Sequence, residues 1–276
     1  MASSHAYELK ETLLKASNIS LSFGNNVVLK DVNVEVKDIV RPGIEQGQII
    51  GFLGPSGIGK TLFSEILAGI RKPTTGEVLV GSNQAPVEIG RVGMVQQKYP
   101  LFYHRDVWDN LQIVADLKIK DKKLRKEKID NFLTRFGLIQ HKKKYPAQLS
   151  GGQKQRLAII QALLACEDIL IMDEPFSGLD VNMLNEVSSV LSELASLNEL
   201  LTIIVISHDV TATTSISDTL WVMGRDRDIN GNIIPGAKIK HHYDLLDLDL
   251  AWHKNMTADP RFLQLTTEIK ALFKNL

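Results

Sequence analysis

An apolar strand followed by a glycine-rich loop and a helix constrains this chain more than any other feature. The apolar run Gln48–Leu53 is typical of a strand covered on both faces. After the loop, apolar side chains recur at helical spacing until Lys72-Pro73 stops the helix. This order predicts an α/β fold with the loop at the carboxyl end of a strand. The loop reads Gly54-Pro55-Ser56-Gly57-Ile58-Gly59-Lys60-Thr61.

The loop at 54–61 fits a phosphate-binding pattern. Its glycines let the backbone curl so that N–H groups point at phosphate oxygens, and the helix that follows adds a favourable dipole. Lys60 is expected to reach the terminal phosphates, and the Thr61 hydroxyl to ligate Mg²⁺. The alternative is a glycine-rich turn that matches by chance, and the flanking strand and helix favour the phosphate loop.

Two adjacent carboxylates end a second apolar strand, Ile169–Met172. In an open α/β sheet they would lie at the edge where ligands bind. Asp173 suits a hold on Mg²⁺, and Glu174 suits alignment and deprotonation of an attacking water. The alternative is that these acidic residues only keep the strand end soluble, and their combination with the phosphate loop favours the catalytic reading.

A second glycine motif opens the helix expected over Lys154–Ala165 and creates another anion-binding helix N-terminus. One nucleotide does not need two such sites on one monomer. A second copy packed head-to-tail would bring this motif onto the phosphate held by the first. The motif reads Leu149-Ser150-Gly151-Gly152-Gln153.

Charge and composition exclude several classes of protein. The 276 residues hold 32 basic and 32 acidic side chains, so the basic excess usual in nucleic-acid-binding proteins is absent. The single cysteine, Cys166, is expected to be a small buried hydrophobe, and it indicates a reducing compartment. No apolar run reaches the ~20 residues that a membrane span needs, and Met1–Lys15 does not read as a secretory signal. A membrane span would have to be in another chain.

The remaining pattern predicts three further parts. Period-2 alternation at Ile19–Phe23 and Asp31–Lys37 predicts half-buried strands, followed by a loop over Asp38–Gln46. The segment from about 100 to 146 is helical and charged, and its basic run Lys118–Lys128 is either a solvated face or a surface for acidic headgroups or a partner. Beyond Leu201–Ile206, another strand, come a hairpin at 229–233 and a helical end from residue 261.

Together these motifs resemble the ATPase subunits of ABC transporters, from about residue 19 to residue 222. The phosphate loop, the 149–153 signature and Asp173-Glu174 match that family in order and spacing. Ser177-Gly178-Leu179-Asp180 is similar to its D-loop, and His208 after an apolar strand is similar to its switch histidine. Gln97 lies where the Q-loop glutamine is found, and Phe23 where an aromatic side chain stacks on adenine. Taken singly, Phe23 would be a core residue, His208 a capping or surface residue, Gln97 an ordinary loop residue and Asp180 a helix cap.

The resemblance implies a phosphate-loop NTPase fold with a mostly parallel sheet. The expected core covers approximately 19–99 and 147–222 and includes an antiparallel β subdomain. A helical subdomain at about 100–146 is inserted into it, and an extension of unknown role covers 223–276. The implied cofactors are ATP and Mg²⁺. The implied catalytic residues are Glu174, His208 and Lys60, and the metal-binding residues are Thr61, Gln97 and Asp173. Nucleotide-binding residues are Phe23, Gly54 to Leu62, Gln97, Ser150, Gly151, Gly152, Gln153 and Asp180.

The implied function is ATP hydrolysis that energises an ABC transporter, with import of a small solute favoured. The implied partners are a second nucleotide-binding subunit (the same chain or a paralogue), membrane-spanning permease subunits and a substrate-binding protein. This arrangement would place the chain peripherally on the cytoplasmic face of the cell membrane. An exporter or lipid-moving ATPase, a soluble ABC-type ATPase acting on DNA or ribosomes, and a regulatory ATPase without a transported solute stay open.

Four departures limit what the resemblance carries over. The expected loop at Asp38–Gln46 is longer than usual. Gln96 stands where an apolar or aromatic residue is usual, which leaves either Gln96 or Gln97 as the ligand-side glutamine. Leu62 replaces a second hydroxyl residue, although Thr61 remains for Mg²⁺. The tail after Gly224 has no obvious counterpart in the family.

Overall fold

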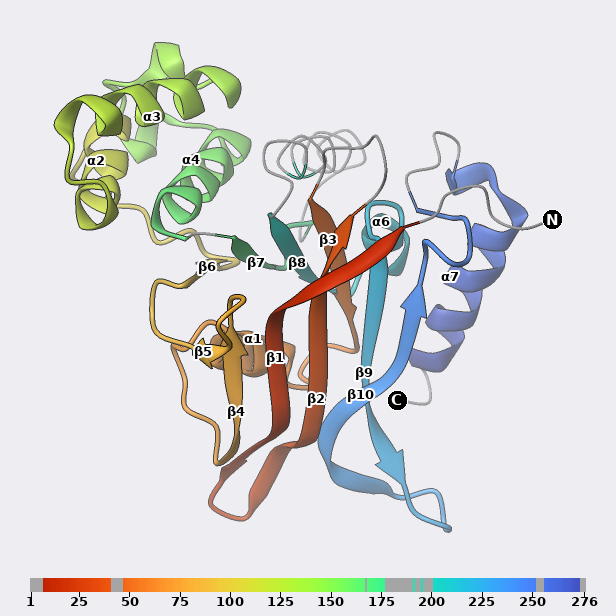
Figure 1. Ribbon diagram of the computed structural model, residues 1–276. Helices are drawn as coiled ribbons and strands as arrows, with labels where there is room; N and C mark the ends of the chain where they lie inside the picture. The colour runs from red at the N-terminus through yellow and green to blue at the C-terminus, as the bar shows by residue number, and fades with distance from the viewer. Residues whose placement is uncertain are drawn as a thin grey trace.

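Ten strands form one continuous sheet in the part of the chain that the computed structural model describes, residues 7–40, 47–166, 168–176, 191, 195, 201–251 and 256–273 (Figure 1). Their order across the sheet is β5-β4-β1-β2-β10-β9-β3-β8-β7-β6. The strands are β1 (Glu8–Phe23), β2 (Asn26–Val40), β3 (Gln48–Leu53), β4 (Thr75–Val80), β5 (Ala85–Pro86), β6 (Val92–Val95), β7 (Ile169–Asp173), β8 (Thr202–Ser207), β9 (Thr219–Arg227) and β10 (Ile233–Asp244).

Helices cover both faces of this sheet. The longer ones are α1 (Lys60–Leu67), α2 (Val107–Lys118), α3 (Lys122–Arg135), α4 (Gly151–Ala165) and α7 (Pro260–Phe273). Shorter helical segments are η1 (Ile139–His141), η2 (Pro146–Gln148), α6 (Val210–Thr214) and η3 (Met256–Ala258). No helix in the described residues is long and apolar enough to cross a membrane.

The strands β9, β3, β8, β7 and β6 run parallel to one another. β3, β7 and β8 are buried along their whole length, as expected for strands covered on both faces. Side chains alternate between the two faces. Ile49, Leu170 and Ile203 pack with α4 in one core cluster, and Ile50 and Ile204 pack with α1 in another. Helices α1 and α4 therefore cover opposite faces of the parallel strands.

Strands β1 and β2 form a long antiparallel hairpin joined to β4. β2 alternates buried and exposed side chains over most of its length, which is the pattern that predicted a strand at Asp31–Lys37. The loop expected from Asp38 starts later than predicted, because β2 and its pairing with β1 continue to Val40. Asp38 is a buried strand residue, and residues 41–46 lie outside the described part of the chain.

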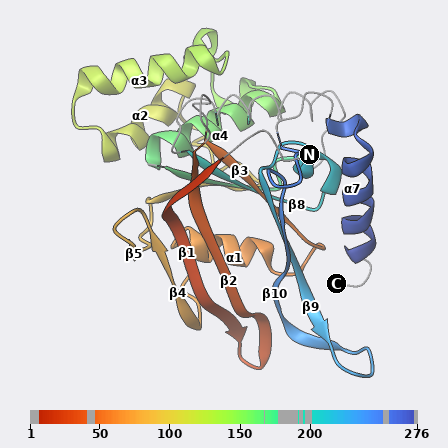
Figure 2. The ribbon, with the colours of Figure 1, turned by 45° about the vertical axis from the view of Figure 1, so that its right-hand side comes forward.

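The charged segment expected near 100–146 forms α2, α3 and two 3₁₀ turns, which gather with α4 at one end of the molecule (Figures 1 and 2). Asp106 and Asp121 begin α2 and α3 by accepting hydrogen bonds from backbone N–H groups in the first turn. Asn110 is fully buried, and its amide donates to the carbonyl oxygens of Phe102, Arg105 and Asp106. This side chain ties the loop before α2 to the helix itself.

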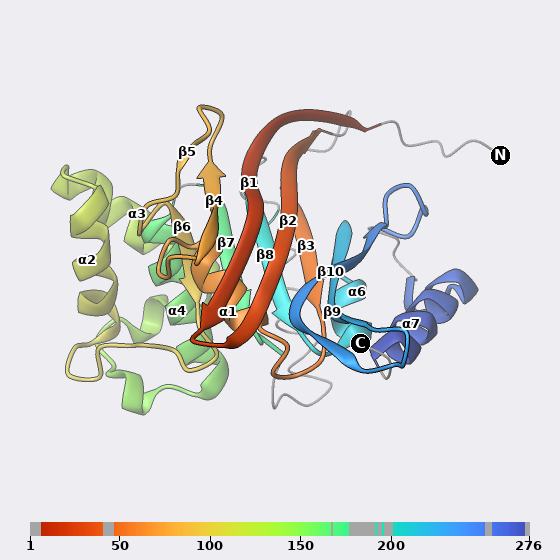
Figure 3. The ribbon, with the colours of Figure 1, turned by 90° about the horizontal axis from the view of Figure 1, so that it is seen from below.

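The hairpin predicted at 229–233 joins β9 to β10. Strand β9 crosses residue 222, where the C-terminal extension was expected to begin. β10 pairs with β9 on one side and with β2, at Ala237–Leu29, on the other. Figure 3 shows β10 between these two strands, so the C-terminal hairpin links the antiparallel and parallel parts of the sheet. Nothing in the sequence pattern predicted this link.

Candidate nucleotide-binding site

The site is built on the carboxyl ends of three parallel strands. Leu53, the last residue of β3, pairs with Ser207 at the end of β8. Asp173, the last residue of β7, pairs with Ile206. The segments that follow these strands therefore leave the sheet side by side, as in open α/β sheets that bind ligands.

The glycine-rich loop at 54–59 curves from β3 into α1 through two left-handed residues. Gly57 has φ +75° and Gly59, the N-cap of α1, has φ +114°. A Cβ atom at Gly54 would lie 3.0 Å from the carbonyl oxygen of Met223 on β9. These glycines therefore allow both the curvature of the loop and its close approach to the sheet.

Lys60 turns its ammonium back into this loop. Its Nζ donates to the carbonyl oxygens of Gly54 (2.8 Å) and Pro55 (3.2 Å), and it lies 3.9 Å from Glu174 Oε1. Burial lowers the pKa of Lys60, and the charges of Glu174 and Asp173 oppose that shift. The ammonium is thus held at the loop by acceptors that anionic phosphate oxygens could replace.

Asp173 lies across from the first turn of α1. Its Oδ2 accepts a 2.9 Å hydrogen bond from the Thr61 hydroxyl, while its Oδ1 is buried and has no hydrogen-bond partner among the described residues. Burial raises the pKa of this carboxyl, and the Thr61 hydrogen bond opposes the rise. A buried carboxylate oxygen without a partner next to a hydroxyl oxygen fits the oxygen ligands that Mg²⁺ prefers. The two residues expected to hold the metal are therefore together.

Glu174 and His208 form the second contact at this edge. His208 Nδ1 lies 2.8 Å from Glu174 Oε2. Glu174 has φ +52°, a conformation that is costly for a non-glycine residue, and its N–H donates to the carbonyl oxygen of Ile206. The Glu174 side chain is 16% exposed, whereas that of His208 is 53% exposed. The carboxylate thus lies between a buried ammonium and an accessible imidazole.

A pocket of about 280 Å³ opens over these groups. Ser56 and Leu62 contribute to its lining, as expected, but Val28 of β2 was not predicted. The alternation of β2 placed Val28 on one face of a strand without indicating that this face meets the loop. The lining residues are Val28, Ser56, Gly57, Gly59, Lys60, Thr61, Leu62 and Glu174.

Phe23 lies at the end of β1 and is 50% exposed, so it is not a core residue. Arg71, which the sequence analysis did not single out, places its guanidinium carbon 5.8 Å from the centre of the Phe23 ring. Arg71 is itself held by Glu65 at 2.6 Å. An aromatic ring steadied on one side by a cation and otherwise accessible is suited to stacking on a base.

The glutamines after β6 lie at the same edge of the sheet. Val95 pairs with Met172, so Gln96 and Gln97 continue alongside Asp173 and Glu174, and both are exposed. The structure does not show which of the two is the ligand-side glutamine. Asp180 and the rest of the expected D-loop lie outside the described residues.

The signature residues lie apart from the pocket. Ser150 is the N-cap of α4, and it and Gln153 exchange hydrogen bonds between side chain and backbone N–H in a capping box. A Cβ atom at Gly151 or Gly152 would meet no described residue within 4 Å, so the part of the chain that the structure describes leaves the first turn of α4 uncovered. Because α1 and α4 cover opposite faces of the sheet, the phosphate loop and the signature are separate surfaces of one chain.

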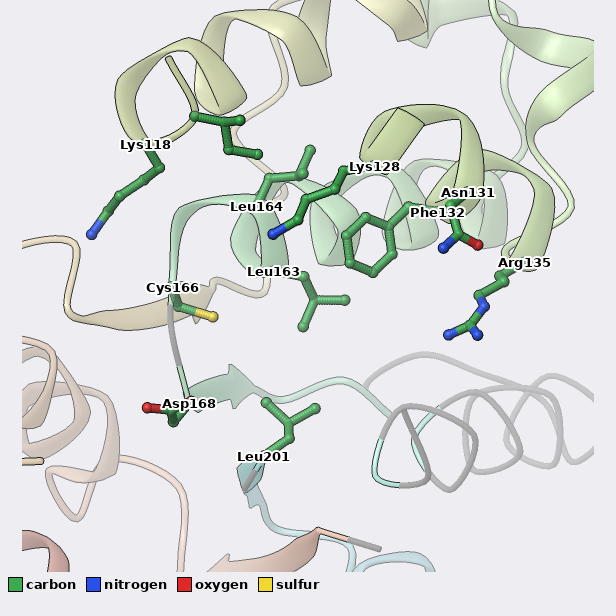
Figure 4. Close-up of a pocket in the computed structure, with 11 residues that line it drawn as sticks. Lys118, Lys128, Asn131, Phe132, Arg135, Leu163, Leu164, Cys166, Asp168 and Leu201 are labelled. Atoms are coloured by element: carbon green, nitrogen blue, oxygen red, sulfur yellow. The ribbon is translucent and has the colours of Figure 1, made fainter. Parts of the chain in front are cut away.

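A larger pocket, of about 610 Å³, lies at the other end of β7 and β8 (Figure 4). Lys128, Phe132 and Arg135 line it from one stripe of α3, and Leu163 and Cys166 line it from the end of α4. Burial raises the pKa of the Cys166 thiol to about 11, so the thiol stays neutral, but the residue is partly exposed rather than buried as expected. The pocket therefore combines an apolar floor with a mainly basic rim that also includes Asp168.

Comparison with known proteins identifies the class of protein. The ABC transporter family model matches residues 38–177. The spermidine/putrescine import ATP-binding protein PotA of Fusobacterium nucleatum is 36% identical over 213 residues, or 75% of this chain and 53% of PotA. The glutamate/aspartate import ATP-binding protein GltL of Escherichia coli K12 is 36% identical over 220 residues, or 76% of this chain and 87% of GltL. The chain thus spans about half the length of PotA and most of the length of GltL.

A solved structure supports the fold. CbiO1 of Clostridium perfringens, described as part of the ABC transporter complex CbiONQ, aligns with a TM-score of 0.71, at 23% identity, over 95% of this chain and all of CbiO1. The chain belongs to the ABC transporter family, as one of its ATP-binding members. The family resemblance and the expected phosphate-loop α/β fold are confirmed.

The buried carboxyl of Asp173 leads to a prediction about stability. Because burial raises its pKa, the folded chain binds this proton more tightly than the unfolded chain. Stability therefore falls as pH rises through the raised pKa and stays lower at neutral pH. Asp173→Asn removes that charge and is expected to raise the Tm of the nucleotide-free protein by a few degrees, while abolishing any gain in Tm from Mg²⁺ with ATP.

Thermal unfolding followed by circular dichroism at pH 7 measures both effects. Asp121→Asn is the matched control, because asparagine and aspartate cap helices equally well and Asp121 is exposed. A lower Tm for Asp173→Asn without nucleotide would show that the Asp173 charge does not destabilise the folded state.

Proposed function

We propose that this chain binds and hydrolyses ATP to energise an ABC transporter; the relatives PotA and GltL are named as import ATP-binding proteins. The observation that carries the proposal is the position of Glu174. Its two oxygens meet Lys60 on one side and His208 on the other, at the mouth of an open glycine loop. A carboxylate between a phosphate-binding ammonium and an accessible imidazole is suited to orienting a water for attack on a phosphoryl group.

The chain's own residues account for most of this chemistry. The Lys60 ammonium leaves the carbonyl oxygens of Gly54 and Pro55 and holds the phosphates electrostatically. Glu174 accepts a proton from the attacking water. The contact between His208 Nδ1 and Glu174 Oε2 orients the carboxylate. The other ring nitrogen of His208 can donate a hydrogen bond to the transferred phosphate. Backbone N–H groups of the loop and of the start of α1 surround the anion.

Thr61 and Asp173 are proposed to hold Mg²⁺, with Gln97 as a further ligand from the β6 side. The metal would neutralise charge on the phosphate oxygens. The orphaned Oδ1 of Asp173 supports this assignment, because a cation would satisfy it. Phe23 is proposed to stack on the adenine.

Two chains are proposed to form each complete site. The residues that line the phosphate-loop pocket come from β2, the loop, α1 and the end of β7. Gly151 and Gly152 lie in the exposed first turn of α4, elsewhere on the surface, where backbone N–H groups have no acceptor within the helix and favour an anion. A second copy or a paralogue, packed head-to-tail, would bring its signature onto the phosphate held by the first. Asp180 is kept as a proposed nucleotide-binding residue, on the family resemblance alone.

The proposed partners are membrane-spanning permease subunits and a substrate-binding protein, and the proposed location is the cytoplasmic face of the cell membrane. PotA and GltL are both named as import ATP-binding proteins, which supports import of a small solute. They differ in solute, a polyamine against acidic amino acids, so the solute class stays open. The formal net charge of zero gives no support for a nucleic-acid partner.

The helical subdomain is proposed to carry the contact with the permease. Its larger pocket offers Phe132 and Leu163 as apolar floor and Lys128 and Arg135 as basic rim. In the described residues, neither of these two cations takes part in an ion pair. A cytoplasmic segment of the permease with an apolar face and an acidic side chain would satisfy both features.

Replacing Glu174 tests hydrolysis directly. Glu174→Gln keeps the shape of the side chain and can still contact His208, but it cannot accept a proton. We expect ATP hydrolysis to fall by at least about a hundredfold with nucleotide binding retained. The variant should also accumulate as a nucleotide-bound dimer.

Phosphate release and sedimentation velocity with ATP measure the two effects. Glu77→Gln, at an exposed position on β4, is the matched control and should behave as wild type. Hydrolysis at the wild-type rate by Glu174→Gln would refute the assigned role.

Replacing Ser150 tests whether the signature acts from the second chain. Ser150→Arg places a bulky cation at the exposed N-terminus of α4, so head-to-tail closure should fail and hydrolysis should be lost. Binding of ATP to the isolated chain should stay within about twofold of wild type, because Ser150 does not line the pocket.

Equilibrium binding of a fluorescent ATP analogue and phosphate release separate the two properties. Ser82→Arg, in the exposed turn after β4, is the control for the added charge. Full hydrolysis by Ser150→Arg, with no dimer at any concentration, would show that one chain is sufficient.

The membrane partner can be tested by site-specific photocrosslinking in the native membrane. A benzophenone side chain at Tyr103, which is 55% exposed in the segment between β6 and α2, should form an adduct with an integral membrane protein. The same probe at Ile229, fully exposed at the β9–β10 turn, should not. Equal yields at both positions, or adducts with soluble proteins alone, would contradict the proposed contact between the helical subdomain and the permease.

A further inference from the structure

We infer that the C-terminal helix α7 is a positioning element for His208, an inference that rests on the proposed ATP hydrolysis. His208 directly follows β8 and precedes α6, a helix of only five residues. Helices this short are not stable on their own in water. Asp209 caps α6 by accepting a hydrogen bond from Ala212 N–H, but one cap does not fix the helix in space. The direction in which His208 leaves the sheet therefore depends on what packs against α6.

What packs against α6 is the C-terminal segment. Phe262, Leu265 and Ile269 lie on one face of α7 and are almost completely buried. They share a core cluster with Val210, the second residue after His208, and with Leu53, the last residue before the phosphate loop. Figure 1 shows α7 alongside α6, on the side of the molecule away from the helical subdomain. One apolar cluster thus contains the residue before the phosphate loop and a residue that closely follows His208.

A polar contact adds direction to this packing. Lys270, in the last turn of α7, donates a 2.8 Å hydrogen bond from Nζ to the Thr211 hydroxyl on α6. The apolar packing fixes which face of α6 is covered, and this hydrogen bond, although exposed, adds a directional contact between two named atoms. Thr211 is three residues from His208, close to one turn of helix. We therefore assign Lys270 the role of holding α6 so that the imidazole stays within reach of Glu174.

Lys270→Met tests this role, because methionine keeps an unbranched apolar chain and removes only the donor. We expect kcat for ATP hydrolysis to fall about three- to fivefold, with KM for ATP and the Tm close to wild type, since small displacements of a catalytic group lower the rate of the chemical step. Lys270→Arg should restore most of the activity. Thr211→Val should match Lys270→Met, and the double variant should be no slower than either single variant. Gln264→Met, at an exposed α7 position, is the control.

A spectroscopic measurement separates positioning from general weakening of the fold. In proteins labelled at histidine, the NMR signals of His208, identified by their loss in His208→Ala, should shift or broaden in Lys270→Met and stay unchanged in Gln264→Met. An unchanged kcat and unchanged His208 signals in Lys270→Met would overturn the inference while leaving the hydrolysis itself standing. A wild-type chain without ATPase activity, alone or with its partners, would instead refute the proposed function.

Discussion

The shared register of parallel strands is the constraint on which the rest of the structure depends. Because β3, β7 and β8 run in the same direction and end together, the phosphate loop, the Asp173-Glu174 pair and His208 leave the sheet as neighbours although they are distant in sequence. Each strand is buried on both faces, so a register slip would disrupt the packing of its side chains against the helices on both sides and is strongly disfavoured. The strands thereby set the separation of the groups proposed to act in catalysis.

The site itself costs stability. A buried ammonium at Lys60, a buried carboxylate at Asp173 and a left-handed backbone at Glu174 are each unfavourable in the free protein. The Lys60 ammonium attracts the carboxylates of Asp173 and Glu174, which offsets part of the cost, and the surrounding packed core supports the remainder. Within the described part of the chain, these charged side chains lack full hydrogen-bonding and ionic partners, so their interaction energy improves most when a phosphate anion and a metal cation bind together. Such a site is organised for its ligands before they bind.

Sequence reasoning predicted the core of this arrangement, since the motifs carry their own local signals. Glycines mark the curved loop, and Asp173 and His208 each follow an apolar strand, so both the elements and their common edge could be predicted. The contribution of Val28 and the support of Phe23 by Arg71 could not, because they arise from hairpin packing that no local pattern encodes. The loop was predicted to begin at Asp38, before the true end of β2, because strand pairing was again not visible in the local pattern. Pairing with β1 extends β2 to Val40 beyond the end of its clear alternation.

The C-terminal segment shows how a part without a motif can still serve the site. Its hairpin inserts β10 between β2 and β9 and so joins the half of the sheet that carries Phe23 to the half that carries the phosphate loop. Its helix then returns to pack beneath Leu53 and Val210. Sheet continuity and apolar packing act here over long sequence separations, so the local signals for the hairpin and the final helix did not indicate where these elements would pack. A chain lacking this segment would lose both the link between the two parts of the sheet and the support of α6, so we regard the tail as part of the ATPase core.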